Sequence, residues 1–523
     1  MTKSQLNPFL SLCILLALIL SGCALAPTAT PTPMPTPTKT PIPTSTPVPA
    51  RFEKRDCMAS ISAMTEKVDC GVLFVPEDRS QPNSPLIQLA VAIIRSSNAH
   101  PAPDPVVYLQ GGPGENALQF LPGFPDTFRG ILANRDLIVF DQRGVGSSSP
   151  SLACPEEEDQ VLKDFAKRDL SREEWQQHSL QADQACYDRL VKEGRNLSAY
   201  TSAASAADVN DLRIALGYAK WNLYGGSYGT RLALTIMRDF PQGVRSVVLD
   251  SVWPPQVDSD AEAAGNVERA LNLIFERCAA DAQCNADYPD LKTVFYDAVA
   301  RFDAKPGTTS LVRPSNGKFA LAYMDGDAMI GLVSSLLYST DALPYLPKMI
   351  YELRDGRLDN MMLQNWRDHV FGGDYGSAGM QLSVECAEEA NFPSAHATPT
   401  ANAAVSSRIQ DAYGRDPFGE CSALWKVKPA AAFDNQPVVS DIPTLILTGD
   451  NDPATPPAWG KLAAQTLSKS YYFEFTWAAH GVIYGSGPAA SCSQGMMNAF
   501  VANPTSAPDS TCMKDLRVSF VKK

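Results

Sequence analysis

Residues 221–230 read WNLYGGSYGT, and this stretch contains the strongest indication of the fold. Its first part, Trp221–Tyr224, is a short apolar run typical of a buried strand, and a helical pattern begins at Tyr228. Between the two lies the pattern G-x-S-x-G, in which a serine on a very tight turn needs neighbours without side chains. We therefore predict that Ser227 is a nucleophile. The alternative is a glycine-rich turn after a buried strand.

A serine hydroxyl needs a base, and the chain has five histidines. In a strand–turn–helix setting of this kind the chain order is serine, then Asp or Glu, then histidine. His480 meets this order and follows the strand pattern Tyr471–Phe475, so we predict it as the base. An isolated histidine is more often a surface or core residue, and the other four precede Ser227 or lie in a helical stretch: His100, His178, His369 and His396.

The carboxylate that orients the base should follow the preceding strand, Thr444–Leu447. That strand leads into residues 448–456, TGDNDPATP, which contain two acids, Asp450 and Asp452. The pattern does not choose between them, and Asp, Asn and Pro also favour a plain acidic turn.

A site for the oxyanion is predicted where the strand Val106–Leu109 ends. The next residues, 110–114, read QGGPG, and their glycines allow backbone amides to approach a ligand closely. One amide of this turn and the amide of Tyr228 would form the oxyanion hole. The alternative is a loop without a role.

Strand and helix patterns alternate along much of the chain, which predicts a mostly parallel sheet covered on both faces. The alternation stops between about Gln256 and Asn435, where helical patterns dominate. We therefore expect an α/β core in two parts, 51–255 and 436–523, with a largely helical cap, 256–435. The predicted strands are Ile87–Ile94, Val106–Leu109, Asp136–Phe140, Trp221–Tyr224, Val244–Asp250, Thr444–Leu447 and Tyr471–Phe475.

The first fifty residues resemble an export signal and a tether. Phe9–Leu20 is an apolar run of signal-peptide length, and Leu20–Cys23 resembles a bacterial lipobox, which implies acylation of Cys23. Residues 23–50 are rich in Pro and Thr, a composition typical of an extended linker. We expect a signal peptide over 1–22 and an exported lipoprotein of the cell envelope, anchored in a lipid bilayer through Cys23. The alternative is an ordinary signal peptide with an incidental cysteine.

Composition excludes some partners. The chain has 523 residues with 44 basic and 57 acidic side chains, a formal net charge of −13, which argues against a nucleic-acid partner. Ten of the twelve cysteines lie beyond the lipobox, an even number that suits disulfides in an oxidising compartment. A metal cluster would need CxxC or HxxxH spacings, and none occurs, so we expect no metal. The simplest pairing joins sequence neighbours: Cys57 with Cys70, Cys154 with Cys186, Cys278 with Cys284, Cys386 with Cys421 and Cys492 with Cys512.

Four motifs occur in order: 110–114 (QGGPG), 141–144 (DQRG), 223–230 (LYGGSYGT) and the pattern G-x-x-D-x-x-T-P over 449–456. Together they resemble the α/β-hydrolase serine peptidases of the proline iminopeptidase and tripeptidyl aminopeptidase family. The resemblance implies Asp452 as the triad acid, and Gly112 and Tyr228 as the amide donors. Residues 141–144 are expected to form a structural turn. Two residues depart from the family pattern. The family usually has His at the position of Gln110, and it often has Gly at the position of Ala479.

An aminopeptidase must bind a free α-ammonium group, which needs a fixed carboxylate. The resemblance extends to an acidic residue two positions after a cysteine, Cys386, which implies Glu388 as that carboxylate, with Glu389 in reserve. The alternative is an exposed acidic helix end.

These observations predict a membrane-tethered serine exopeptidase that acts on peptides with a free N-terminus and needs no cofactor. Two other hypotheses stay open at this point. One is an esterase or lipase on the same scaffold, since fold and triad do not fix the acyl group. The other is a catalytically silent protein that binds peptides under the cap.

Overall fold

The computed structural model describes residues 50–165, 172–312, 317, 319–370, 376–389, 392, 405–413 and 421–523. The described residues belong to one compact unit, Thr46–Lys523. The predicted signal peptide, Cys23 and the linker up to residue 49 lie outside them. In the described part of the chain, no helix has the length and apolar character needed to cross a bilayer.

A nine-stranded sheet forms the centre of this unit, in the order β1-β2-β3-β5-β4-β6-β7-β10-β11. The first three strands and β5 pair antiparallel, whereas every pairing from β5 to β11 is parallel. Each of the seven predicted strands is present. The bounds are β1 Arg51–Arg55, β2 Val68–Pro76, β3 Leu86–Ile94, β4 Val106–Leu109, β5 Leu137–Phe140, β6 Trp221–Gly226, β7 Val244–Asp250, β10 Thr444–Gly449 and β11 Ser470–Phe475.

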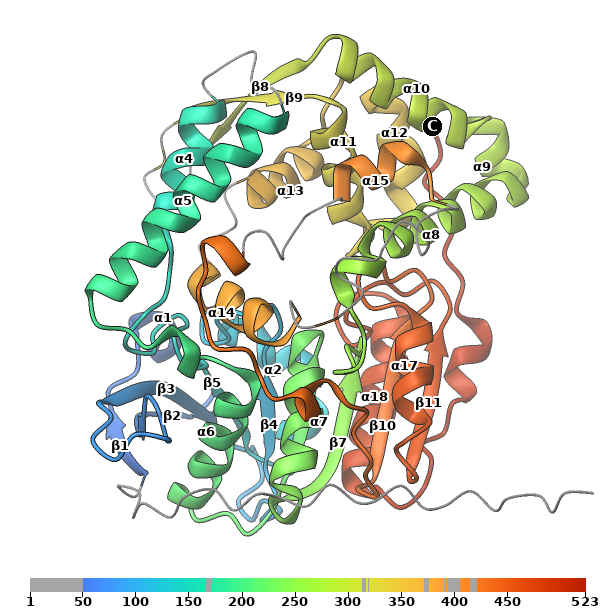
Figure 1. Ribbon diagram of the computed structural model, residues 1–523. Helices are drawn as coiled ribbons and strands as arrows, with labels where there is room; N and C mark the ends of the chain where they lie inside the picture. The colour runs from blue at the N-terminus through green and yellow to red at the C-terminus, as the bar shows by residue number, and fades with distance from the viewer. Residues whose placement is uncertain are drawn as a thin grey trace, which may run out of the picture. The chain divides into compact units, whose positions relative to one another are not determined.

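Helices cover both faces of the sheet, as the near-continuous apolar strands predict. Strand β4 shows how one short run supplies two cores: Val107 and Leu109 pack on one face, while Val106 and Tyr108 pack on the other. The first face is covered by α6 (Ser202–Ala215), α7 (Tyr228–Asp239) and α17 (Pro457–Ala464) (Figure 1). The second face is covered by α1 (Ala59–Ser62), α2 (Phe124–Thr127), α3 (Arg129–Leu132) and α18 (Pro488–Ala502).

The cap leaves the sheet after β7 and returns before β10, and it has an apolar core of its own. Figure 1 shows most of its helices together above the sheet in this view, beyond one end of the strands. They are α8 Ser259–Ala280, α9 Ala282–Asp287, α10 Leu291–Ala304, α11 Gly326–Leu337, α12 Leu346–Arg354, α13 Asn360–Val370, α14 Ala378–Glu388 and α15 Ser407–Tyr413.

Three parts of the cap region were not anticipated. It contains a two-stranded hairpin, β8 (Gly307–Val312) and β9 (Phe319–Met324). Two helices from the first part of the core, α4 (Pro155–Phe165) and α5 (Arg172–Lys192), extend to this hairpin, where α4 contacts β9 (Figure 1). Helix α14, in contrast, packs against the start of α7 rather than into the main core of the cap.

Disulfide bonds join the ten cysteines in the predicted pairs. The pairs are Cys57–Cys70, Cys154–Cys186, Cys278–Cys284, Cys386–Cys421 and Cys492–Cys512. Each bond links segments that are close in sequence, so the bonds fix local loops rather than the arrangement of the layers.

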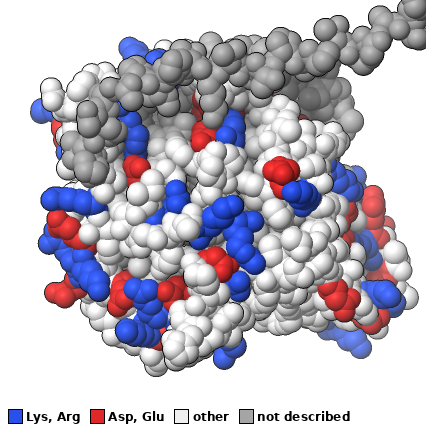
Figure 2. Space-filling view, turned by 90° about the horizontal axis from the view of Figure 1, so that it is seen from below, with Lys and Arg blue, Asp and Glu red and all other residues white. Residues whose placement is uncertain are grey.

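The face seen from below in Figure 2 carries basic and acidic side chains interspersed with wide neutral areas. On the part of this face that the structure describes, no continuous basic surface is visible of the kind that a phosphate backbone needs.

Candidate active site

Ser227 stands alone between strand β6, which ends at Gly226, and helix α7, which begins at Tyr228. Its backbone has φ 55° and ψ −126°, a strained conformation for a residue with a side chain. The flanking glycines are required by contact: a Cβ on Gly225 would lie 2.3 Å from the carbonyl oxygen of Gly229. A Cβ on Gly229 would lie 2.0 Å from the carbonyl oxygen of Leu109 in strand β4. This is the geometry that the G-x-S-x-G pattern predicts.

His480 and Asp452 form a hydrogen-bonded pair at the ends of the last two strands. His480 Nδ1 lies 2.9 Å from Asp452 Oδ2 and 3.0 Å from Oδ1. Thr455 donates its hydroxyl to Asp452 Oδ2 over 2.8 Å, and its backbone amide donates to Oδ1 over the same distance. Because Nδ1 is engaged by the carboxylate, Nε2 is the ring nitrogen left to exchange a proton.

The pair is buried, and each member stabilises the charge of the other. Burial acts to lower the pKa of His480, but the Asp452 carboxylate outweighs it, so the pKa of His480 is raised. Burial acts to raise the pKa of Asp452, but the imidazole and the Thr455 donors outweigh it, so the pKa of Asp452 is lowered. Asp452 is therefore charged at neutral pH.

The other acid that the sequence left open, Asp450, serves a different purpose. Its carboxylate pairs with Arg277 of cap helix α8 and accepts the backbone amide of Trp477 over 3.0 Å. Arg269, also on α8, donates to the backbone carbonyl oxygens of Asp450 and Asp452. The cap therefore holds the turn that carries the acid, and Asp452 is the acid that reaches His480.

Asp250, the last residue of β7, ties the serine turn to the histidine loop. Its backbone oxygen accepts the amide of Ser227 over 3.0 Å. Its carboxylate accepts the amides of Val482 and Ile483, over 2.8 and 3.1 Å, and the Tyr224 hydroxyl over 2.9 Å. Burial raises the pKa of Asp250 to about 6. This residue, which the sequence reasoning missed, joins the Ser227 turn to the loop that follows His480.

The predicted oxyanion loop lies against the nucleophile. A Cβ on Gly111 would lie 3.1 Å from Ser227 Cβ and 3.6 Å from Ser227 Oγ, so the loop passes the hydroxyl at van der Waals distance. Gly112 has φ +105°, which favours glycine. Tyr228 is the first residue of α7, where a backbone amide has no partner within the helix. The two amides predicted to bind the oxyanion thus flank Ser227.

Residues 141–144 form the structural turn that the sequence predicts. The Asp141 carboxylate accepts the amides of Ala117, Leu118 and Ser147. Arg143 is fully buried and donates to both oxygens of Asp208, each over 2.8 Å. These contacts fasten the loops beneath the site.

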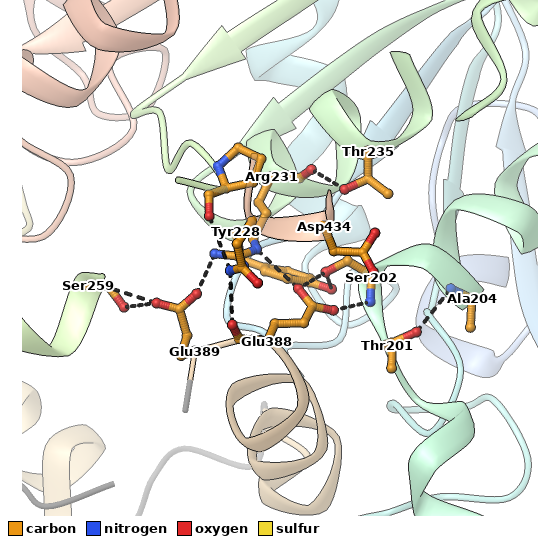
Figure 3. A network of polar contacts seen from close by, with 12 residues as sticks. Thr201, Ser202, Ala204, Tyr228, Arg231, Thr235, Ser259, Glu388, Glu389 and Asp434 are labelled. Carbon is orange, nitrogen blue, oxygen red and sulfur yellow. Dashed lines mark hydrogen bonds and ion pairs between the residues drawn. The ribbon is translucent and has the colours of Figure 1, made fainter. Parts of the chain in front are cut away.

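The expectation for Glu388 and Glu389 does not fit the structure. Both side chains are buried, at 4% and 3% exposure, and both pair with Arg231 of α7. Glu388 also accepts the amide and hydroxyl of Ser202, and Glu389 accepts the amide and hydroxyl of Ser259. Figure 3 shows the carboxylates directed at these protein donors. A substrate ammonium would have to displace Arg231, so we interpret this network as a clamp between α14 and the core.

Comparison with known proteins agrees with the observed fold. The α/β hydrolase fold family model matches residues 104–285, and a model described as TAP-like protein matches residues 407–512. Serine protease Hip1 of Mycobacterium tuberculosis is 27% identical over 457 residues, 84% of this chain and 86% of the relative. Tripeptidyl aminopeptidase of Streptomyces coelicolor is 32% identical over 217 residues, 40% of this chain and 39% of the relative. Carboxylesterase B of Mycobacterium tuberculosis is 28% identical over 415 residues, 74% of this chain and 76% of the relative.

Proposed function

Because the chain belongs to the α/β-hydrolase family and is related to serine peptidases with a TAP-like region, we propose that it is a serine exopeptidase. In this proposal it releases residues from the free N-terminus of peptides and works at the cell envelope. The observation that carries the proposal is the hydrogen-bonded His480–Asp452 pair, whose histidine loop is joined to the Ser227 turn through Asp250.

In the proposed mechanism, Ser227 Oγ attacks the scissile carbonyl carbon while His480 Nε2 takes the hydroxyl proton. The negative charge that develops on the carbonyl oxygen is bound by the amides of Gly112 and Tyr228. His480 then returns the proton to the leaving amine, which departs and leaves an acyl-enzyme. Water, deprotonated by His480, hydrolyses this ester and restores Ser227. Asp452 stays charged and orients the imidazole throughout.

Two observations favour a peptide end as substrate. The cap reaches the base: the ring of Tyr338, at the end of α11, lies 5.1 Å from the ring of His480, measured between centroids. Thr340 also accepts the amide of Ala479 over 2.9 Å. A covered site admits the end of a chain more readily than its middle, and one relative is named a tripeptidyl aminopeptidase.

An esterase is the second candidate, because one relative is named carboxylesterase B and the fold does not fix the acyl group. The two functions are separated by comparing an aminoacyl arylamide, its N-acetyl derivative and a short-chain aryl ester. We expect N-acetylation to abolish arylamide cleavage. Equal cleavage of the free and acetylated arylamides, or activity on the ester alone, would contradict the exopeptidase.

The nucleophile is tested with a fluorophosphonate probe on the purified chain, with Ser227→Ala as the control. We expect wild-type protein to be labelled and the variant to be unlabelled. An unlabelled wild-type protein would instead favour a silent peptide-binding protein.

The proposed anchor rests on the sequence alone, because Cys23 lies outside the described residues. Metabolic labelling with a radioactive fatty acid, compared between wild type and Cys23→Ser, tests it. Label retained in the variant would contradict acylation at Cys23.

A further inference from the structure

The loop after β4 carries a pair of polar side chains at the mouth of the proposed active site. Gln110 Nε2 donates to Glu115 Oε2 over 2.7 Å. The side chain of Glu115 folds back over the oxyanion loop, since a Cβ on Gly112 would lie 3.5 Å from Glu115 Cγ. Glu115 is exposed, whereas Gln110 is only 8% exposed. The pair therefore joins a fixed amide to a carboxylate that substrate can reach.

The pair has unused acceptors. Gln110 Oε1 is buried and has no hydrogen-bond partner among the described residues. The orientation of this amide is set by Glu115, because a carboxylate oxygen can only accept, so Nε2 must face it. In the described part of the chain, Glu115 has no cationic partner either. A buried acceptor gains from a hydrogen-bond donor, and a ligand with N–H groups would supply one.

The negative charge of Glu115 is also unfavourable for the proposed reaction unless a cation binds next to it. Glu115 belongs to the same short loop as Gly112, whose amide is proposed to bind the developing negative charge, and two negative charges at short range repel. Its field also reaches the base, since Glu115 is one of the groups that raise the pKa of His480. A positive group bound at Glu115 during the reaction would remove this repulsion.

We propose that Gln110 Oε1 and the Glu115 carboxylate bind the α-ammonium group of the substrate residue whose carbonyl Ser227 attacks. This inference rests on the proposed exopeptidase function and names the group that recognises the peptide end. An α-ammonium carries three N–H donors and a positive charge, which match an acceptor of Gln110 and a charge on Glu115 that meet no partner among the described residues. Glu388 and Glu389, the earlier candidates, are held by Arg231.

The position of the pair also limits how many residues are released. The α-nitrogen of an amino acid lies about 2.5 Å from its own carbonyl carbon, because only Cα separates them. The ammonium of a three-residue unit lies about 7 Å further away along an extended chain. An acceptor that folds over the oxyanion loop therefore suits release of a single N-terminal residue.

The test compares four substrates: alanine p-nitroanilide, N-acetylalanine p-nitroanilide, trialanine p-nitroanilide and p-nitrophenyl propionate, which presents the same acyl group as alanine without the amine. Each is assayed with wild type, Glu115→Gln and the control Glu66→Gln, a half-buried glutamate two residues before strand β2. We expect Glu115→Gln to lower kcat/KM for alanine p-nitroanilide at least tenfold, mainly through KM. Hydrolysis of the propionate should be unchanged or faster in Glu115→Gln, because this substrate brings no cation to offset the carboxylate, and its acid limb should move to lower pH.

Each alternative result has a separate meaning. Equal losses on alanine p-nitroanilide and on the propionate would overturn the proposal, because Glu115 would then support the chemistry and not the ammonium. A wild type that prefers the trialanine substrate, with Glu115→Gln retaining that activity, would overturn it and leave the exopeptidase intact. A wild type that hydrolyses only the propionate would overturn the exopeptidase function and this inference together. The control variant should match wild type on all four substrates.

Discussion

Replacing Arg231 with methionine tests the clamp between α14 and the core. Arg231 is 1% exposed and donates from Nε to Glu388 over 3.1 Å and from Nη1 to Glu389 over 2.6 Å. Its guanidinium also lies 5.2 Å from the ring centroid of Trp253. Methionine keeps much of the aliphatic volume and removes the charge, so two buried carboxyl groups lose their cation. Removing one partner of a buried ion pair costs about 3–5 kcal/mol of unfolding free energy.

The pH dependence of this loss follows from the carboxyl groups. Burial already raises the pKa of Glu389 from 4.5 to about 7. A carboxyl group without Arg231 can avoid buried charge by taking up a proton, which costs about 1.4 kcal/mol for each pH unit above its ordinary pKa. The cost of a neutral carboxyl group reaches about 5 kcal/mol at pH 8 and falls below about 1 kcal/mol at pH 5, and wild-type Glu389, with its pKa of about 7, already carries all but about 1.4 kcal/mol of it at pH 8. A carboxyl group with a raised pKa weakens the fold above its ordinary pKa, so Arg231→Met should be far more destabilised at pH 8 than at pH 5.

The measurement is urea unfolding followed by tryptophan fluorescence at both pH values, under conditions that keep the disulfides oxidised. Arg129→Met is the matched control, since its ion pair with Asp126 is exposed and should contribute less than about 1 kcal/mol. An equal loss at pH 5 and pH 8, or a loss within 1 kcal/mol of the control at pH 8, would refute the clamp. A rise in KM for free-amine substrates in Glu388→Gln, without loss of stability, would restore Glu388 as the ammonium site.

Four further predictions concern the proposed chemistry and the covalent framework. Ser227→Ala should lower kcat by about 10⁴-fold or more with little change in stability, as measured by steady-state kinetics and thermal unfolding. A large loss of stability with little loss of kcat would instead indicate a structural serine. The active form needs a neutral imidazole, and the pKa of His480 is raised. We therefore expect kcat/KM to decrease as the pH is lowered, with a midpoint above about 6.5. Asp250→Asn removes a charge that raises this pKa, so the midpoint should move to lower pH, and an unchanged profile between pH 5 and 9 would contradict the link. Replacing Cys386 and Cys421 by alanine opens a loop of 35 residues, which should cost about 4 kcal/mol in urea unfolding; a loss below 1 kcal/mol would count against this reasoning.

The strands of the parallel sheet could be predicted because each is a short apolar run bounded by turn residues. Val106–Leu109 and Thr444–Leu447 are examples, and the glycines that follow them mark the ends where the site forms. Strand β1, Arg51–Arg55, carries alternating charges at the edge of the sheet and has no such signal. The hairpin of β8 and β9 was missed because it lies in a region where helical patterns dominate.

Some site residues could likewise be predicted from the sequence, and others could not. Ser227 and His480 could be found from sequence because each sits in a local pattern at a strand end, whereas Asp452 was distinguished from Asp450 only by the family resemblance. The environment of Glu388 could not, because its partner Arg231 lies 157 residues earlier in the chain. Asp250 was overlooked because a carboxylate at a strand end looks the same in sequence whether it faces solvent or accepts buried amides. An Asp directly after an apolar strand, next to the nucleophile strand, is a signal that could have found it.

Arg269 and Arg277 reach from cap helix α8 to the turn that carries Asp452, and this contact has a consequence for engineering. A cap of this kind cannot be exchanged between relatives as an independent cassette. A chimera that imports a foreign cap without two arginines at these positions would lose the support of its own acid turn, and turnover would fall even on substrates that fit the new cap. Exchanging the cap would therefore change both substrate specificity and catalytic rate. Libraries that recombine caps should keep helix α8 with the catalytic core.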